Sequence, residues 1–77
     1  MSVRVRFFAS LREQVGMSEC EVTLEDVASV AELWALALPG QSLPGNVLAA
    51  KNMEYVGLNE LVSEGDEVAY FPPVTGG

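Results

Sequence analysis

The segment SVAELWALALPG, residues 29–40, carries the clearest structural signal in the chain. Its apolar residues recur with the spacing of one continuous stripe along an α-helix. They are Val30, Leu33, Trp34, Ala37 and Leu38. Ser29 precedes the stripe and Glu32 follows three residues later, which is the spacing of a capping box. Because Pro39-Gly40 cannot continue a helix, the segment predicts one amphipathic helix with defined ends.

The chain before this helix contains the patterns of two short strands and one helical turn. The strands are predicted at residues 3–7 (VRVRF), which alternate apolar and charged side chains, and at residues 21–24 (EVTL). Between them, Ser10 stands three residues before Glu13, so we expect a second capping box. It would open a short helix over residues 11–15 that Gly16 ends.

After the main helix the chain consists of loops and short strands. Three strands are predicted, at residues 47–50, 55–56 and 67–71. We expect a loop over residues 41–46, a turn at Asn52 and a turn over residues 63–66, where Gly65 can adopt positive φ at little cost. The order β-α-β-α-β-β-β predicts an α+β fold, with a mixed sheet of about five strands packed on one main helix.

Length and composition predict one small soluble domain. The chain has 77 residues, and 49% of them are hydrophobic, which is enough for a core. Cys20 is the single cysteine, so no intramolecular disulfide is possible and a reducing compartment is indicated. The N-terminal alternation does not resemble a signal peptide, and no apolar run approaches the ~18 residues of a membrane span. We therefore expect a cytoplasmic protein without a membrane partner.

The charged and nucleophilic residues exclude several functional classes. Eleven acidic residues against four basic ones give a net charge of −7, which argues against nucleic acid as a partner. This acidic excess suits a basic enzyme surface, or it serves solubility alone. With no histidine and one cysteine, the usual Cys-His and Ser-His-Asp arrangements are excluded and a zinc site is disfavoured. We expect no metal or cofactor bound by the chain itself.

The C-terminal residues have an unusual composition. Pro72 and Pro73 cannot donate to a sheet, so the last strand must end before them. Gly76 and Gly77 have no side chains, so the end of the chain is thin enough to enter another protein's active site. The sequence predicts a domain over residues 1–71 and a flexible tail over residues 72–77. The alternative is an ordinary frayed terminus.

Four segments resemble the family of molybdopterin synthase small subunits, which are β-grasp (ubiquitin-like) sulfur carriers. The most specific is residues 65–77, GDEVAYFPPVTGG. Residues 7–13 (FFASLRE) are similar to the family's first strand-to-helix segment, and residues 30–33 (VAEL) to the start of its main helix. Asn52 with residues 54–56 fits its middle strand pair. The resemblance extends over essentially the whole chain.

This resemblance implies a function that depends on the C-terminal carboxylate. In the family, an adenylyltransferase of the ubiquitin-activating type uses ATP and Mg²⁺ to form an acyl-adenylate at the terminal glycine. A sulfur source then displaces AMP and leaves a thiocarboxylate. The tail enters the large subunit of the synthase, in a heterotetramer of two small and two large subunits. There it donates sulfur to cyclic pyranopterin monophosphate during molybdenum cofactor biosynthesis, and the active site is expected on the large subunit.

The resemblance also implies roles for individual residues. Gly77 would carry the acyl-adenylate and the thiocarboxylate, and Gly76 would keep the tail narrow. The residues expected to line the partner's channel are Pro72, Pro73, Val74 and Thr75. Phe71 either forms part of a partner surface or belongs to the core. Cys20 lies between two glutamates that disfavour its thiolate, so we expect a structural role rather than sulfur transfer.

Other functions of the same fold stay open from sequence alone. One is a sulfur carrier for thiamine synthesis or tRNA thiolation. Another is a protein modifier that would join Gly77 to lysines through isopeptide bonds. A third is a ubiquitin-like binding module with an inert C-terminus. Two features depart from the family pattern: Lys51 occupies a position where an apolar strand residue is expected, and the loop over residues 39–46 is rich in proline and glycine.

Overall fold

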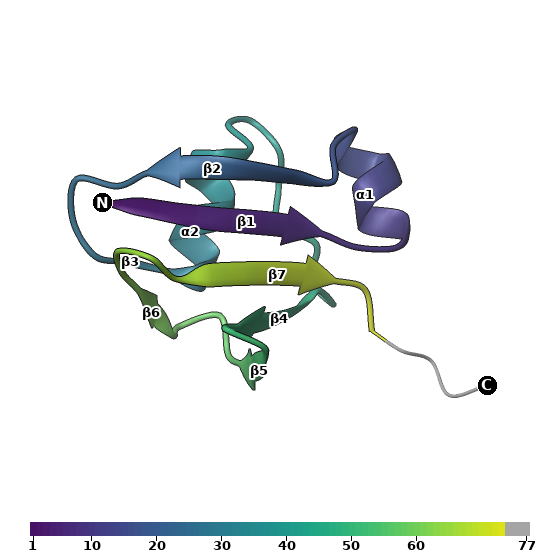
Figure 1. Cartoon of the computed structure of the whole chain (residues 1–77). Coiled ribbons are helices and arrows are strands. Elements are labelled where there is room, and N and C mark those ends of the chain that lie inside the picture. The colour runs from purple at the N-terminus through teal and green to yellow at the C-terminus, as the bar shows by residue number, and fades with distance from the viewer. Residues whose placement is uncertain (74–77) are drawn as a thin grey trace.

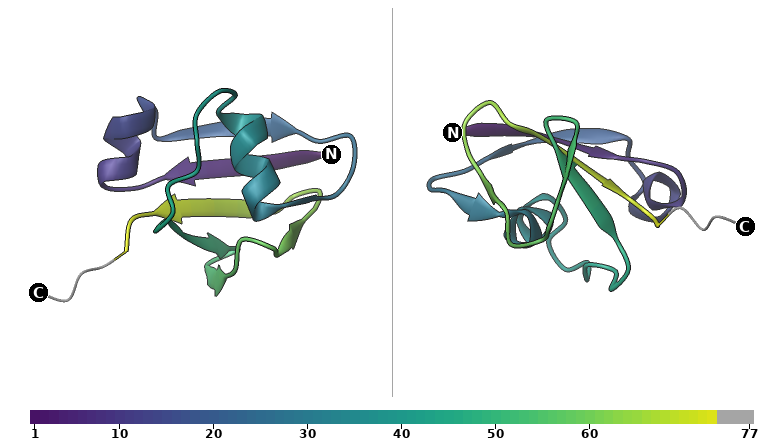
Figure 2. Two further views of the ribbon diagram at one scale, coloured as in Figure 1. Left: turned by 180° about the vertical axis from the view of Figure 1, so that it is seen from behind. Right: turned by 90° about the horizontal axis from the view of Figure 1, so that it is seen from below.

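Five strands form one mixed sheet that curves over a single main helix (Figures 1 and 2). The computed structural model describes residues 1–73. Its elements are β1 (Ser2–Phe7), α1 (Ser10–Val15), β2 (Glu19–Thr23), β3 (Ala28–Ser29), α2 (Val30–Ala37), β4 (Leu48–Lys51), β5 (Glu54–Val56), β6 (Leu61–Val62) and β7 (Glu67–Phe71). The sheet order is β2-β1-β7-β4-β5, with β1 and β7 parallel and the other pairs antiparallel. The predicted β-grasp arrangement is confirmed.

Helix α2 begins with the predicted capping box. The Ser29 hydroxyl accepts a hydrogen bond from the Glu32 amide at 3.1 Å, and the Ser29 amide donates to the Glu32 carboxylate at 2.9 Å. Two amide groups that have no partner within the helix are thereby satisfied. At the other end the Leu38 amide donates to the Trp34 carbonyl, and Pro39 stops further turns.

The capping box predicted for the first helix is wrong. Ser10 is already the first helical residue, and the N-cap position belongs to Ala9, which has φ 55° and no side-chain cap. The helix begins earlier because the chain turns as soon as β1 ends, and the Leu11 amide donates to the Phe8 carbonyl at 3.1 Å. The predicted end at Gly16 is confirmed, with φ 81° in the left-handed region.

The core lies between the sheet and α2. It contains every second residue of β1, as the alternation predicts, together with the apolar stripe of α2. The fully buried side chains with the largest volumes are Tyr70, Phe7, Leu33, Val3, Val5, Val30, Val62 and Val68. The side chains of β1 on the other face, Arg4 and Arg6, are exposed, which is the expected pattern for a half-buried strand.

The predicted bounds of four strands need correction, and one small sheet is not predictable from pattern. β2 begins at Glu19, because Glu19 and Cys20 pair with Arg6 and Val5 of β1 although neither extends an apolar run. β4 begins and ends one residue later than expected, at Leu48 and Lys51, and β1 and β5 each begin one residue earlier, at Ser2 and Glu54. β3 and β6 form a separate two-stranded sheet. Strands of two residues are too short to show a period.

Candidate functional site at the end of β7

The last strand is fixed firmly to the core through Tyr70. This side chain is fully buried, and its hydroxyl donates a hydrogen bond to the Val30 carbonyl at 2.5 Å. Burial raises the pKa of Tyr70, because the phenolate would lose its hydration. The Tyr70 carbonyl accepts from the Phe8 amide at 3.1 Å, at the end of the parallel β1–β7 ladder. The side chain and the backbone of Tyr70 are therefore both fixed.

Aromatic contacts hold the same residue from the sides. The rings of Trp34 and Tyr70 meet edge to face with centroids 5.0 Å apart, and Phe7 stacks on Tyr70 at 5.9 Å. Phe7 also meets Trp34 edge to face at 5.7 Å. The indole N–H of Trp34 donates to the Gln41 carbonyl at 3.1 Å, so its polar group is satisfied. This cluster links α2, β1 and β7 just before the chain leaves the sheet.

Phe71 points the opposite way from Tyr70, because side chains alternate along a strand. It is half-buried on the outer face of the sheet, away from α2, and does not belong to the core. Its ring packs against Tyr55 of β5 with centroids 5.6 Å apart and an interplanar angle of 61°. Leu48 of β4 is its direct cross-strand partner. The sequence leaves open whether Phe71 lies in the core or on the surface, and the structure supports the surface position.

The outer face carries an apolar patch around Phe71, which we call the outer patch and define as Phe8, Leu48, Tyr55 and Phe71. Phe8 and Leu48 are exposed, and Tyr55 is 77% exposed. Arg6 lies beside it, with its guanidinium carbon 5.3 Å from the centroid of the Phe8 ring. Exposed aromatic residues with one adjacent cation are typical of a protein–protein contact surface.

The outer patch lies next to the point where the chain leaves the sheet. β7 ends beside the β1–α1 connection, at the end of the sheet opposite the N-terminus (Figure 1). Pro72 and Pro73 follow and are half-buried. The remaining predicted site residues, Val74, Thr75, Gly76 and Gly77, lie outside the described residues, as does most of the predicted tail.

Cys20 does not belong to the outer patch, because it packs against the core on the other face of the sheet. It belongs to the edge strand β2, which β1 separates from β7. The pKa of its thiol is raised by burial. The direction agrees with the sequence-based expectation, but the physical cause is loss of hydration rather than the neighbouring glutamates. A thiol with a raised pKa is a weak nucleophile at neutral pH.

Residues 1–73 show no candidate metal site and one polar hollow. They contain no group of three or more histidine, cysteine, aspartate or glutamate side chains that could hold a metal ion. A shallow polar hollow of about 250 Å³ is lined by Arg4 and by acidic residues that include Glu21, Glu64 and Glu67. It lies at the start of β7, so the full strand separates it from the outer patch. None of the described helices is long and apolar enough to span a membrane.

Sequence reasoning missed three members of the outer patch. Phe8, Leu48 and Tyr55 were not among the predicted site residues. A usable signal exists for Phe8: the alternation of β1 places Phe7 in the core, so an adjacent phenylalanine must face outward. For Leu48 and Tyr55 the signal is absent, because their pairing with β7 depends on a register that only the folded sheet defines.

Comparison with known proteins agrees with this geometry. The model of the ThiS family matches residues 5–77. The molybdopterin synthase sulfur carrier subunit of Escherichia coli K12 is 40% identical over 84 aligned residues, covering 97% of this chain and 99% of that protein. SAMP1 of Haloferax volcanii, a small archaeal modifier protein, has a TM-score of 0.80 at 27% identity and covers all of both chains.

A third comparison concerns an assembly. The structure of the complex of subunits 1 and 2 of the molybdopterin-converting factor from Helicobacter pylori contains a chain with a TM-score of 0.67. That chain is 27% identical, and all of both chains are covered. The match to the family model spans almost the whole sequence, and these neighbours share the ubiquitin-like β-grasp fold. The chain therefore belongs to the ThiS family.

Proposed function

We propose that this chain is the sulfur carrier subunit of a molybdopterin synthase, and that sulfur travels as a thiocarboxylate on Gly77. The observation that carries the proposal is the relationship to the Escherichia coli subunit, which extends over nearly the full length of both proteins. The site agrees with it, because an exposed apolar surface lies next to the strand end that leads to the two glycines. Near the end of β7, the described residues supply no nucleophile of their own.

The proposed chemistry follows from the nature of a carboxylate, which is a poor electrophile. An adenylyltransferase of the ubiquitin-activating type would use ATP and Mg²⁺ to convert the Gly77 carboxylate into an acyl-adenylate. A sulfur donor would then displace AMP. The resulting thiocarboxylate is ionised near neutral pH and nucleophilic, for the same reason that a thiolate is the reactive form of cysteine. The large subunit would bind the pterin precursor and supply the acid and base groups.

Intact mass spectrometry tests this proposal directly. The protein is incubated with its adenylyltransferase, ATP, Mg²⁺ and a sulfur donor, and the expected change is the mass difference between sulfur and oxygen, located at Gly77. A variant that lacks Gly77 is the control and must not gain mass. An unchanged mass with an active adenylyltransferase would refute the proposal, and the binding module with an inert C-terminus would replace it.

The outer patch is proposed to dock on the large subunit. Aromatic side chains that pack at the centre of an interface often dominate its binding energy. Tyr55 is the most exposed member of the patch and already contacts Phe71. We expect Tyr55→Ala to weaken binding of the large subunit about tenfold. The matched control is Leu36→Ala, an exposed apolar residue of α2 on the other side of the sheet. Equal effects of both variants in calorimetry would contradict this surface.

A protein modifier is the second candidate, because SAMP1 has the highest TM-score among the structures compared above. A modifier and a carrier both require adenylation of Gly77, so the activation assay does not separate them. Their products differ: a modifier forms isopeptide bonds with lysines of other proteins. Conjugates in extracts of the native host that contain a Gly77–lysine linkage would favour this candidate, and free thiocarboxylate would favour the carrier.

A further inference from the structure

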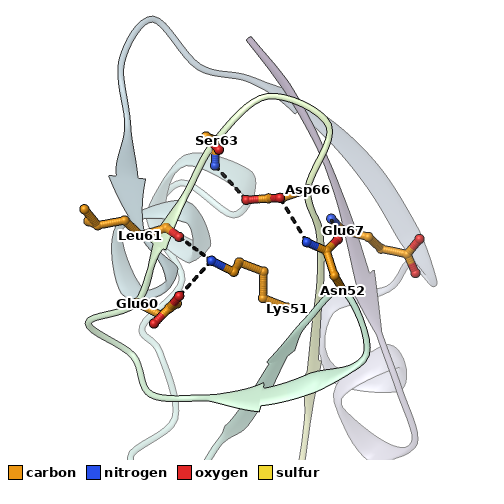
Figure 3. Close-up of polar contacts among 7 residues, drawn as sticks. All are labelled: Lys51, Asn52, Glu60, Leu61, Ser63, Asp66 and Glu67. Carbon is orange, nitrogen blue, oxygen red and sulfur yellow. Dashed lines mark hydrogen bonds and ion pairs between the residues drawn. The ribbon is translucent and has the colours of Figure 1, made fainter.

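Lys51, where the family resemblance leads us to expect an apolar residue, is held by two hydrogen bonds. Its ammonium group donates to the Glu60 carboxylate at 2.7 Å and to the Leu61 carbonyl at 3.0 Å. Figure 3 shows the side chain reaching from β4 to the segment before and within β6. Lys51 pairs with the inward-facing Val68 of β7, so its stem lies on the core side, and the side chain is only 23% exposed.

The backbone around Lys51 is also fixed. The next residue, Asn52, has φ 52°, and its side chain donates to Asp66 at 3.0 Å and accepts from the Glu67 amide at 3.0 Å. Asp66 in turn accepts from the Ser63 amide at 2.9 Å. These bonds join the β4–β5 turn to the β6–β7 turn (Figure 3). The two sides of the Lys51–Glu60 contact are therefore held together by a second set of bonds.

The position of this amine matters because Lys51 is the single lysine among the 77 residues. An acyl-adenylate reacts with free amines: the nitrogen attacks the carbonyl carbon, the C–N bond forms, the bond to AMP breaks, and the amine gives up a proton. The product would be an isopeptide between Gly77 of one copy and a lysine of another. Such a product would consume the carrier without transferring sulfur.

We propose that the contact of Lys51 with Glu60 and Leu61 is a guard that protects the chain's single lysine from acylation by the activated C-terminus of another copy. The inference rests on the proposed function, because it requires an adenylated Gly77. Attack requires a free lone pair and an approach path to the nitrogen, and here the nitrogen is protonated and directed at two oxygen acceptors. The hydrogen bond to Glu60 raises the pKa of Lys51, which lowers the neutral fraction further.

The first arm of the test measures amine reactivity without any enzyme. The folded protein is treated with N-hydroxysuccinimidyl acetate near neutral pH, and acetylation of Lys51 is followed by peptide mass spectrometry. We expect Glu60→Gln to react about two- to fivefold faster than the wild type, the factor that an exposed ion pair corresponds to. The matched control is Glu54→Gln, because Glu54 is the cross-strand neighbour of Lys51 but makes no hydrogen bond to its ammonium group in the described structure.

A relocated lysine provides the positive control. The double variant Lys51→Arg/Met53→Lys moves the single lysine amine two residues along, to a side-chain position that is 97% exposed at the turn of the same hairpin. Arginine at position 51 retains a cation beside Glu60, so we expect the fold to be preserved. We expect the relocated amine to react at least as fast as Lys51 in Glu60→Gln. A wild-type rate equal to that of the double variant would overturn the proposal.

The second arm uses the activating enzyme with ATP and Mg²⁺ and no sulfur donor. We expect Glu60→Gln and the double variant to accumulate a dimer linked from Gly77 to the lysine at least about twofold faster than the wild type and Glu54→Gln, as in the first arm. Equal rates of dimer formation in the wild type and the double variant, or no dimer from the double variant while pyrophosphate is released, would overturn the proposal. No pyrophosphate release with any variant would instead refute the proposed function, and with it the proposed protection of Lys51.

Discussion

Removing one oxygen atom, by Tyr70→Phe, should change both the stability of the fold and its dependence on pH. The Tyr70 hydroxyl is fully buried and bonded to the Val30 carbonyl. A buried hydrogen bond of this kind contributes about 1 kcal/mol to the free energy of unfolding. For a domain of this size, that loss lowers Tm by about 4–8 °C. Phenylalanine keeps the ring contacts with Phe7 and Trp34, so the fold itself should persist.

The pH dependence follows from the raised pKa of Tyr70. The ordinary tyrosine pKa is about 10, so at higher pH the unfolded chain loses this proton while the folded chain keeps it. The contribution of Tyr70 to the free energy of unfolding is therefore fully present below about pH 10. It falls above that pH by up to about 1.4 kcal/mol per pH unit. Tyr70→Phe lacks this loss. Because the variant is about 1 kcal/mol less stable at neutral pH, its free energy of unfolding should equal that of the wild type between about pH 10 and pH 11. At higher pH the variant should be the more stable of the two.

Urea unfolding at several pH values, followed by fluorescence of the single tryptophan, Trp34, measures both quantities. Trp34 is buried against Tyr70, so its emission reports loss of the core. The control is Tyr55→Phe, which removes the hydroxyl of the only other tyrosine, an exposed side chain. Parallel curves for the wild type and Tyr70→Phe up to pH 11 would refute the reasoning, since the hydroxyl could then ionise in the folded state.

Three further outcomes are expected. Ser29→Ala removes the side-chain cap of α2 and should lower the free energy of unfolding by about 1 kcal/mol, measured in the same urea titrations. Gly65→Ala should cost about 1–2 kcal/mol because Gly65 has φ 85°, whereas Gly57→Ala, at a glycine without positive φ and with equally open surroundings, should change stability by less than about 0.5 kcal/mol. Cys20→Ala and the wild type should both gain sulfur at Gly77; a mass gain in the wild type that is lost in the folded variant would assign sulfur transfer to the thiol.

The parts of the fold that the sequence predicts are those with a strong period. The stripe of α2 and the alternation of β1 specify both the element and its buried face, because a helix and a strand each repeat a single direction. The cap at Ser10 fails for a different reason. A capping-box spacing shows only that two side chains could cap a helix that begins at that position. Where the helix begins depends on where β1 ends and the chain turns, at Phe8.

In the candidate site, too, some positions are predictable from sequence and others are not. Alternation along β7 from the buried Val68 places Tyr70 inside and Phe71 outside, which is local information. The neighbours of Phe71 are not local. Leu48 and Tyr55 reach it only because β4 lies between β7 and β5 in one particular register. A shift by one residue would turn these side chains to the other face, so the outer patch is a property of the assembled sheet.

The arrangement at the end of β7 agrees with the proposed chemistry at the terminus of a domain with few reactive side chains. Tyr70 is held through its hydroxyl, its carbonyl and two aromatic contacts, so the strand end has one position relative to the sheet. Phe71, the next residue, belongs to the proposed docking surface. The distance between the docked surface and the first residue of the exit is therefore set when the domain folds. A partner that binds the outer patch therefore meets Pro72 at a fixed place.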